Sequence, residues 1–393
     1  MPQLRFLLAI DYKLSFLGGA QTAFEQQALA LRAAGHAVTV LAPDAGESPR
    51  LRDAGIRLVA VRSRGTVPGM DLPIIPNTQR LRDRLREEMT VRPPSGVVVH
   101  SEFGLATAVL AVARDLGIPT AQTVHTFFWQ GPRAAGAGAP LVRGFHRALT
   151  GLAAPGVALA PAPLDSALRG MTLACARTAD IVLSPSAHQA EALRAAGLPR
   201  VEVLSNTSAL GTEFVDPVAA EPLRLVWAGR FAPEKRIEVA LDAIRLTEAE
   251  LGPDAVRLEV AGGEPPRSLR ESAPAGVSFL GRLTPNQLNE RFAAAHAALI
   301  TSHGFDNQPM VAIEAFRVGR PVIVSDPVLA TEFGAAAIGA VTPEAAGLSE
   351  TLMALVQHPE RLAAASSGAR AFSEAASGDA HAATLVALLG LRA

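Results

Sequence analysis

Residues 4–42 read LRFLLAIDYKLSFLGGAQTAFEQQALALRAAGHAVTVLA, and this stretch decides the fold class. Its first seven residues are apolar apart from Arg5, which indicates a buried strand. A pair of glycines, Gly18 and Gly19, then precedes a helical pattern over residues 20–34, and residues 37–42 form a second apolar run. Strand, helix and strand in this order predict a β-α-β unit with parallel strands.

The same alternation continues along the whole chain, in two windings. In the first winding we expect strands at 57–61, 96–100, 119–125, 181–183 and 201–204, with helices at 79–89, 103–116, before 179 and between Ser186 and Gly197. Ser186 and Gln189 predict a capping box for that last helix. In the second winding we expect strands at 223–228, 257–261, 277–280, 297–301 and 321–325, helices at 235–251, 285–295 and 309–318, and alanine-rich helices in the remainder.

The length and this pattern together predict two α/β domains. A chain of 393 residues exceeds what one hydrophobic core usually supports. We expect a first domain over 1–209, a second over 210–375 with the linker near 209–221, and a C-terminal helix over 376–393 that packs back on the first domain. Residues 131–163, rich in Ala, Gly and Pro, predict an irregular surface loop on the acceptor side. Ligands of open α/β sheets bind beyond the carboxyl ends of the strands, so two such domains face to face predict a cleft between them.

Composition narrows the class of protein further. A net charge of −1 gives no general attraction to nucleic acid, and none is expected as a partner. Cys175 is the single cysteine, which excludes an intramolecular disulfide and favours a reducing compartment. The N-terminal apolar run lacks a small-residue cleavage site, and the apolar stretch 149–164 is interrupted by Gly and Pro. We therefore expect a cytoplasmic protein, with a peripheral position at the inner face of the membrane left open.

A glycine and two cations follow the first strand of the second winding, where residues 227–236 read WAGRFAPEKR. Gly229 lets the backbone approach a ligand closely, and Arg230 and Lys235 can meet a diphosphate near the positive N-terminus of the helix expected from 235. Lys13 and Lys235 are the two lysines among 36 Lys and Arg residues, which favours a need for a compact point charge at 235. A solvent-exposed pair of cations at a helix start is the alternative.

An acidic pair lies in residues 303–314, HGFDNQPMVAIE, before the stretch GRPVIVSD at 319–326. Asp306 lies in a loop from strand to helix, where its carboxylate can accept hydrogen bonds from sugar hydroxyls while N–H groups of the next residues face an anion. Glu314 lies about two turns further on and can hold a ribose through its two hydroxyls. A helix N-cap at 306 and a solvated acid at 314 are the alternative readings.

These residues resemble the retaining nucleotide-sugar glycosyltransferases of family four, which have the GT-B fold of two Rossmann-like domains facing across a cleft. The resemblance covers nearly the whole chain: a Gly-Arg…Lys segment is similar to 229–235, and an acid-x7-Glu motif before Gly-x-Pro-Val is similar to 306–322. It departs at Asp306, where the family usually has Glu, and at 205–209, where SNTSA stands for Pro-Asn-Gly-Val-Asp.

The resemblance implies a role for each candidate residue. It implies that Arg230 and Lys235 neutralise the leaving diphosphate, that Asp306 contacts the donor sugar, and that Glu314 contacts the ribose. A histidine at 125 beside the transferred sugar is implied in the same way, although a strand-end histidine is more often structural. The remaining donor-binding residues implied are Gly18, Gly19, Gly229, Gly262, Gly263, Arg282, Asn307, Gln308, Pro309, Met310 and Val311.

The reaction expected from the resemblance is transfer from a UDP- or GDP-linked sugar with retention of anomeric configuration. No cofactor and no metal are expected, because the sequence holds no Asp-x-Asp pair or His/Cys cluster suited to a cation. The acceptor is not identified. Residues 100–105, HSEFGL, resemble family members that glycosylate membrane lipids, and residues 80–86 are rich in arginine, which favours a membrane lipid or another glycan precursor. A plain solvated face is the alternative for 80–86, because Asp83, Glu87 and Glu88 share the helix. A nucleotide-sugar epimerase and a non-catalytic nucleotide-sugar-binding protein are the alternatives.

Overall fold

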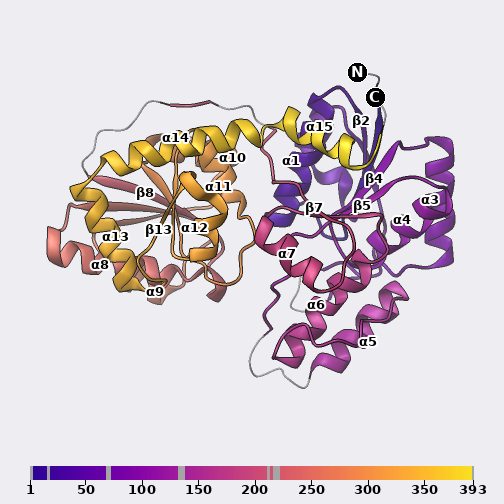
Figure 1. Cartoon of the computed structure of the whole chain (residues 1–393), viewed down its shortest axis with the longest axis horizontal. Coiled ribbons are helices and arrows are strands. Elements are labelled where there is room, and N and C mark those ends of the chain that lie inside the picture. Colours follow the sequence, from indigo (N-terminus) through magenta and orange to yellow (C-terminus); the bar gives the residue numbers. More distant parts are fainter. Residues whose placement is uncertain are drawn as a thin grey trace. The chain divides into compact units, whose positions relative to one another are not determined.

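The computed structural model describes residues 3–15, 18–67, 72–131, 138–209, 213–215 and 222–391. It consists of two compact units, Met1–Ala209 with Gly378–Ala393, and Leu210–Ser377 (Figure 1). Most of the linker expected near 209–221 lies outside the described residues. Each unit is described by itself below.

The first unit is a seven-stranded parallel sheet with helices between its strands. The strand order is β3-β2-β1-β4-β5-β6-β7, so the winding reverses between β1 and β4. The strands are β1 Arg5–Ala9, β2 Ala37–Ala42, β3 Arg57–Ala60, β4 Gly96–Val99, β5 Thr120–Thr123, β6 Ile181–Ser184 and β7 Val201–Val203. The helices are α1 Gly19–Ala33, α2 Pro49–Asp53, α3 Gln79–Val91, α4 Gly104–Asp115, α5 Ala139–Thr150, α6 Pro163–Ala176, α7 Ala187–Ala195 and α15 Gly378–Leu388, with a 3₁₀ turn, η1, at Ala45–Glu47.

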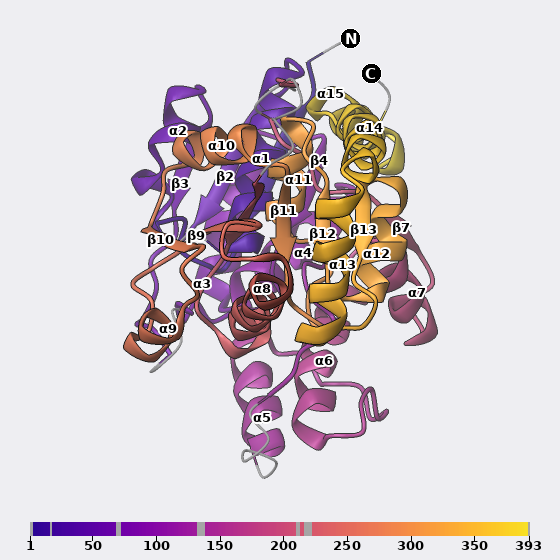
Figure 2. The same cartoon turned by 90° about the vertical axis from the view of Figure 1, so that its left-hand side faces the viewer.

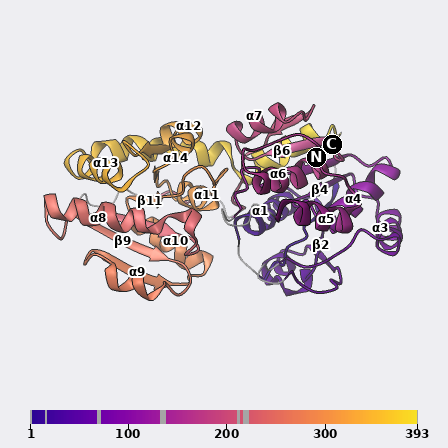
Figure 3. The same ribbon diagram turned by 90° about the horizontal axis from the view of Figure 1, so that it is seen from below.

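Apolar side chains on both faces of this sheet bury its strands. On one face Phe24 of α1 and Leu385 of α15 pack into one apolar cluster with β1 and β2, which places the C-terminal helix against α1. On the other face Met89 of α3 and Val109 of α4 pack over β1 and β4. Helices α5 and α6 lie side by side (Figure 3).

The second unit is a six-stranded parallel sheet of order β10-β9-β8-β11-β12-β13, whose winding reverses between β8 and β11. Helices α8 and α13 pack side by side over it (Figure 2). The strands are β8 Leu223–Ala228, β9 Val256–Ala261, β10 Val277–Gly281, β11 Ala297–Ile300, β12 Val322–Val324 and β13 Ala337–Gly339. The helices are α8 Ile237–Leu251, α9 Arg267–Ser272, α10 Pro285–Ala294, α11 Met310–Arg317, α12 Pro327–Phe333, α13 Ala345–Gln357 and α14 Glu360–Ala375, with 3₁₀ turns η3 at Pro233–Lys235 and η4 at Gly334–Ala336.

Four expectations from the sequence are corrected by the structure. The loop expected at 131–163 contains α5, because Pro140 lies in its first turn and Gly151, with φ of 76°, ends it; residues 132–137 lie outside the described part. The stretch after 326 includes a strand, β13, and not helices alone. Ser186 caps α7 as expected, by accepting from the N–H of Gln189, but the Gln189 side chain bonds the backbone of Val124 and Phe127 and so joins α7 to the segment after β5. The helix expected from 235 begins at Ile237.

Candidate functional site

The candidate residues of the second unit lie where its winding reverses. Strands β8 and β11 are neighbours in the sheet, and the segments that follow them carry Gly229, Arg230 and Lys235 on one side and Asp306 on the other. In open α/β sheets ligands bind at this switch point, outside the carboxyl ends of the strands. The position of these residues in the fold is therefore that of a ligand site.

Lys235 and Asp306 form an ion pair at this point. The Nζ atom of Lys235 lies 2.7 Å from Oδ1 and 2.8 Å from Oδ2 of Asp306, and the two side chains are 23% and 11% exposed. The Nζ atom also lies 5.7 Å from the centre of the Phe305 ring. Partial burial strengthens the interaction between the opposite charges beyond that of an exposed pair. Two residues that the sequence assigned to separate roles thus act on each other directly.

Hydrogen bonds between strand ends hold the backbone at Lys235. The indole Nε1–H of Trp227, in β8, donates to Oγ1 of Thr301 at 3.1 Å. The Thr301 hydroxyl, directly after β11, donates to the backbone carbonyl of Lys235 at 2.7 Å. Lys235 ends the short η3 turn, and Arg236 has φ of 49°, a left-handed conformation that separates η3 from α8. Lys235 is therefore not part of the helix start that the sequence predicted for it.

Three backbone segments approach one another closely at the ends of β8, β9 and β10. The N–H of Gly229 donates to the carbonyl oxygen of Ala261 at 3.0 Å, and the N–H of Gly262 donates to the carbonyl oxygen of Gly281 at 2.8 Å. A Cβ atom on Gly262 would lie 2.5 Å from the carbonyl oxygen of Gly229, whereas one on Gly263 would have no heavy atom within 4 Å. Gly262 is therefore required by packing between strand ends, and Gly263 has room for a side chain.

The cations expected around the donor differ in their surroundings. Arg230 is exposed and lies 3.2 Å from the carboxylate of Glu234. Arg282 is exposed directly after β10. The structure thus pairs Lys235 with Asp306 and Arg230 with Glu234, and the sequence did not predict either pairing.

The remaining donor-side candidates lie at the start of α11. Asn307 and Gln308 are buried, Pro309 is the N-cap of α11, and Met310 and Val311 are its first residues. Glu314 is half-buried on α11. Burial lowers the pKa of Arg317, and the negative charge of Glu314 partly opposes this lowering. Asp326 accepts from the N–H of Gly304 at 2.7 Å and from that of Val328 at 2.9 Å, which holds the loop between β11 and α11 to α12.

A second polar constellation lies at the switch point of the first unit. Asp11 follows β1, and its buried carboxylate accepts hydrogen bonds from the hydroxyl of Ser101 at 2.7 Å and from the N–H groups of Leu105 and Ala106 at the start of α4. Glu102 follows β4 and is also buried. Burial, with the charge of Asp11 beside it, raises the pKa of Glu102 to about 8. Glu102 is therefore mainly protonated at neutral pH.

His125 lies two residues after β5 and contacts the end of β4. Its Nε2 atom is 2.8 Å from Nδ1 of His100. Burial lowers the pKa of His125 to about 4 and that of His100 well below its usual value, so both rings are neutral near pH 7. Gly18 is the N-cap of α1, Gly19 begins it, and residues 16–17 lie outside the described part.

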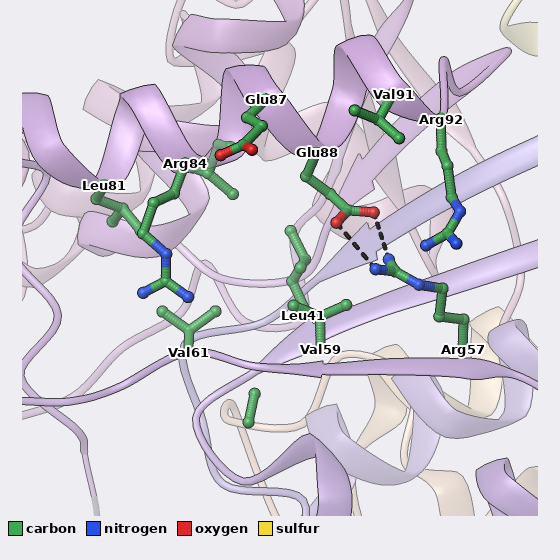
Figure 4. A pocket seen from close by; sticks show the side chains of 12 residues that line it. Leu41, Arg57, Val59, Val61, Leu81, Arg84, Glu87, Glu88, Val91 and Arg92 are labelled. Carbon is green, nitrogen blue, oxygen red and sulfur yellow. Dashed lines mark hydrogen bonds and ion pairs between the residues drawn. The ribbon is translucent and has the colours of Figure 1, made fainter.

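A pocket of about 380 Å³ lies between β3 and α3 of the first unit (Figure 4). Two arginines of this region pair with acids, and the first of them lines the pocket. Arg57 forms a two-pronged pair with Glu88, one contact of which measures 2.9 Å, and Arg86 lies 2.6 Å from Asp115. The arginine-rich stretch 80–86 therefore belongs to a surface of mixed charge.

Two kinds of feature are absent from the residues that the structure describes. The described part of the chain contains no group of three or more His, Cys, Asp or Glu side chains placed to hold a metal ion. Among the described helices, none combines the length and the apolar character that a membrane span requires.

Comparison with known proteins connects both units to one class of enzyme. Residues 17–207 match the model of Glycosyltransferase Family 4, and residues 222–364 match that of Glycosyl transferases group 1. These two matches lie in the two units and together span most of the chain. The chain belongs to the GT-B glycosyltransferases of family four.

Relatives of this glycosyltransferase include a GDP-mannose-dependent alpha-mannosyltransferase from Mycobacterium tuberculosis (strain CDC 1551 / Oshkosh), which is 29% identical over 313 residues, or 75% of this chain and 72% of the relative. Among solved structures, Anabaena HepE in complex with UDP has a TM-score of 0.69 at 14% identity and covers 99% of this chain and 100% of its own. TarM has a TM-score of 0.70 at 9% identity and covers 98% of each chain. At such identities the structural likeness shows the fold alone.

Sequence reasoning missed several polar residues of this glycosyltransferase that lie at the switch points. The sequence predicts no role for Asp11, and it indicates His100 and Glu102 only through the resemblance of residues 100–105 to family members that act on lipids. Asp326 was quoted only as the end of a motif. Each of the four lies one to three residues after a buried strand, and that position is the signal that could have found them.

Proposed function

We propose that this glycosyltransferase transfers a hexosyl residue from a nucleotide diphosphate sugar to an acceptor, with retention of anomeric configuration and without a metal ion. The observation that carries the proposal is the Lys235–Asp306 pair at the switch point between β8 and β11. Two relatives support the donor class, because one is GDP-mannose-dependent and another is solved with UDP. The donor is therefore proposed to be GDP- or UDP-linked.

Each part of the donor has a residue type suited to it. The diphosphate meets Lys235 and Arg230, and Gly229, Gly262 and Gly263 allow its close approach to the backbone. Glu314 holds the ribose hydroxyls, Arg282 lies beside the base, and residues 307–311 offer backbone N–H groups at the start of α11. Asp306 has two carboxylate oxygens, so it can hold Lys235 and accept from a sugar hydroxyl as well.

The same charges account for the chemistry. As the bond from the sugar to the diphosphate breaks, negative charge grows on the departing phosphate oxygens, and fixed cations stabilise it without any reorganisation. Lys235 is held by Asp306 and by its own backbone, so its charge is already in position. An ammonium and a guanidinium at this point supply the positive charge that a divalent ion supplies in other transferases. The acceptor then attacks on the face that the diphosphate leaves.

The acceptor side is assigned to the first unit. Residues 100–105, at the end of β4, carry the resemblance to family members that act on membrane lipids, and His125 lies against them. We therefore place the transferred sugar near His125 and propose a membrane lipid or another glycan precursor as the acceptor. A peripheral position at the inner face of a membrane goes with this acceptor class.

Replacement of Lys235 tests the proposal. A panel of GDP- and UDP-sugars identifies the donor by slow hydrolysis, and the anomer of the released or transferred sugar is read by NMR. Lys235→Ala should then lower kcat by about a hundredfold or more while donor affinity changes less, because the contact is strongest in the transition state. Lys235→Arg should restore only part of the turnover, since a planar guanidinium is a poor substitute for a point charge.

The control is Lys13→Ala, which removes the other lysine of the chain. It should keep wild-type kcat. Turnover of Lys235→Ala equal to that of the control would remove Lys235 from the site, and an inverted product would exclude same-face attack.

A further inference from the structure

Four side chains of the first unit form one continuous line of hydrogen bonds that ends at His125. Nδ1 of His381, on α15, lies 2.9 Å from the backbone carbonyl of Ser205, and its Nε2 lies 2.8 Å from Nε2 of Gln27, on α1. Oε1 of Gln27 lies 2.8 Å from Nε2 of His100. Nδ1 of His100 lies 2.8 Å from Nε2 of His125. We call this the histidine line.

The carbonyl at one end sets the direction of every hydrogen bond in the line. A carbonyl only accepts, so His381 carries its proton on Nδ1 and, as a neutral ring, accepts at Nε2. The NH₂ group of Gln27 must then point to His381, and its oxygen must accept from His100 Nε2–H. The opposite orientation of the Gln27 amide would require His381 to be doubly protonated, and burial lowers the pKa of His381 to about 4.

The same logic fixes the last two rings. His100 donates from Nε2, so in its neutral form its Nδ1 is an acceptor. His125 must therefore carry its proton on Nε2 and donate it to His100, which leaves His125 Nδ1 unprotonated. A hydrogen-bond partner on one nitrogen of a histidine sets the chemistry of the other.

We infer that His381, Gln27 and His100 are positioning residues that hold His125 as the uncharged Nε2–H tautomer for sugar transfer. The inference rests on the proposed function in placing the transferred sugar near His125. It also gives α15 a second role, because this helix packs apolar residues against α1 and in addition delivers one polar side chain, His381, into the line. In this tautomer Nδ1 of His125 is the acceptor nitrogen of the ring.

The ring nitrogens of the histidines report the tautomer directly in the whole 393-residue chain. Long-range ¹H–¹⁵N correlation spectra of protein labelled with ¹⁵N-histidine distinguish protonated from unprotonated ring nitrogens, and His125→Gln assigns the signals among the nine histidines. In the wild type we expect His125 protonated at Nε2 only. In Gln27→Met and in His381→Phe the line is cut, so His125 should show averaged signals from both tautomers.

Turnover distinguishes positioning from packing. Gln27→Met and His381→Phe should lower kcat by about tenfold with donor KM unchanged, on the scale of losing a side chain that orients a catalytic group. His381→Gln, whose amide keeps one donor and one acceptor, should recover most of that loss. Gln26→Met is the matched control: Gln26 is equally buried on α1 but accepts from the N–H of Ala209 at 2.7 Å, outside the line.

Each result decides between the alternatives. His125 protonated at Nδ1 in the wild type, or unchanged His125 signals in Gln27→Met, would overturn the histidine line, and the Gln27 variant serves even where His381→Phe does not fold. A change of the His125 tautomer in Gln27→Met with wild-type kcat would show that sugar transfer does not depend on this tautomer. That result would overturn the role of the histidine line in transfer. The spectra need no substrate, so they decide the line even if no nucleotide sugar proves to be a donor.

Discussion

At the scale of single residues, the two switch points handle buried charge in opposite ways. In the second unit Lys235 and Asp306 compensate each other at 2.7 Å. In the first unit two acids, Asp11 and Glu102, are buried, and burial raises the pKa of both. Three hydrogen-bond donors stabilise the carboxylate of Asp11. Glu102 avoids a second negative charge beside it, because it stays protonated up to a pH of about 8.

The protonated state of Glu102 predicts a stability that depends on pH. Its pKa is about 8 in the folded chain, above the ordinary value of 4.5, so the folded state binds one proton more between these two values. As pH rises through this window, the wild type should lose stability relative to Glu102→Gln by up to about 1.4 kcal/mol per pH unit. Above pH 8 the difference should level off, because the folded state is then ionised as well.

Urea unfolding between pH 5 and 9 measures this difference. In a Trp227→Phe background, Trp129 is the remaining tryptophan and reports on the first unit alone. Glu191→Gln, which replaces an exposed acid on α7 of the same unit, should stay within about 0.5 kcal/mol of its parent at every pH. An equally flat profile for Glu102→Gln would mean that Glu102 is ionised in the folded state at neutral pH.

At the scale of elements, the sequence predicted most strands within one or two residues. The reason is that buried parallel strands are short apolar runs, such as 37–42 and 223–228, bounded by polar or glycine residues. β13 escaped because its three residues, AIG, lie in a stretch of alanine and glycine and lack the valines that mark the equally short β7 and β12. α5 escaped because the Pro and Gly residues at its two ends were taken for interruptions, although they bound the helix.

Pairings between elements could not be predicted in the same way. Lys235 and Asp306 were each singled out, but their contact depends on β8 and β11 being neighbours, which is a property of strand order. The start of α8 was placed two residues early because a left-handed Arg236 leaves no signal in a pattern of apolar residues. The histidine line joins α1, β4 and α15, and no spacing in the sequence indicates it.

Two adjacent glycines after β9 test how closely the strand ends must approach. In Gly262→Ala the new Cβ would lie 2.5 Å from the carbonyl oxygen of Gly229, so β8 and β9 would have to separate at their ends. We expect a loss of about 1–3 kcal/mol in stability and weaker donor binding, as for other overpacked sites. Gly263→Ala is the matched control and should stay within about 0.5 kcal/mol of wild type. Chemical denaturation measures the stability of both variants, and donor titration measures binding to Gly262→Ala. Equal losses of stability in the two variants would contradict the packing argument.

At the scale of the whole molecule, both units follow one plan. Each sheet begins its winding in the order 3-2-1-4, and each places its polar residues after the first and fourth strands. The second unit carries a held cation suited to a phosphate, and the first carries neutral histidines and a protonated acid suited to hydroxyl groups. This division of chemistry supports the proposal that the nucleotide binds to the second unit and the sugar acceptor to the first.

The donor should bind to the chain without a metal ion. If Lys235 and Arg230 supply the positive charge for the diphosphate, GDP-mannose or UDP-glucose should stabilise the chain with EDTA present. A ligand at a hundred times its Kd stabilises the folded state by about 2.7 kcal/mol, which corresponds to about 5–10 °C in Tm for a unit of this size. Differential scanning calorimetry measures this shift, and Lys235→Ala should reduce it, because the diphosphate loses its held cation. Added Mg²⁺ should change the shift little, and stabilisation that appears only with Mg²⁺ would show that the cations of the second unit are not sufficient to hold the donor.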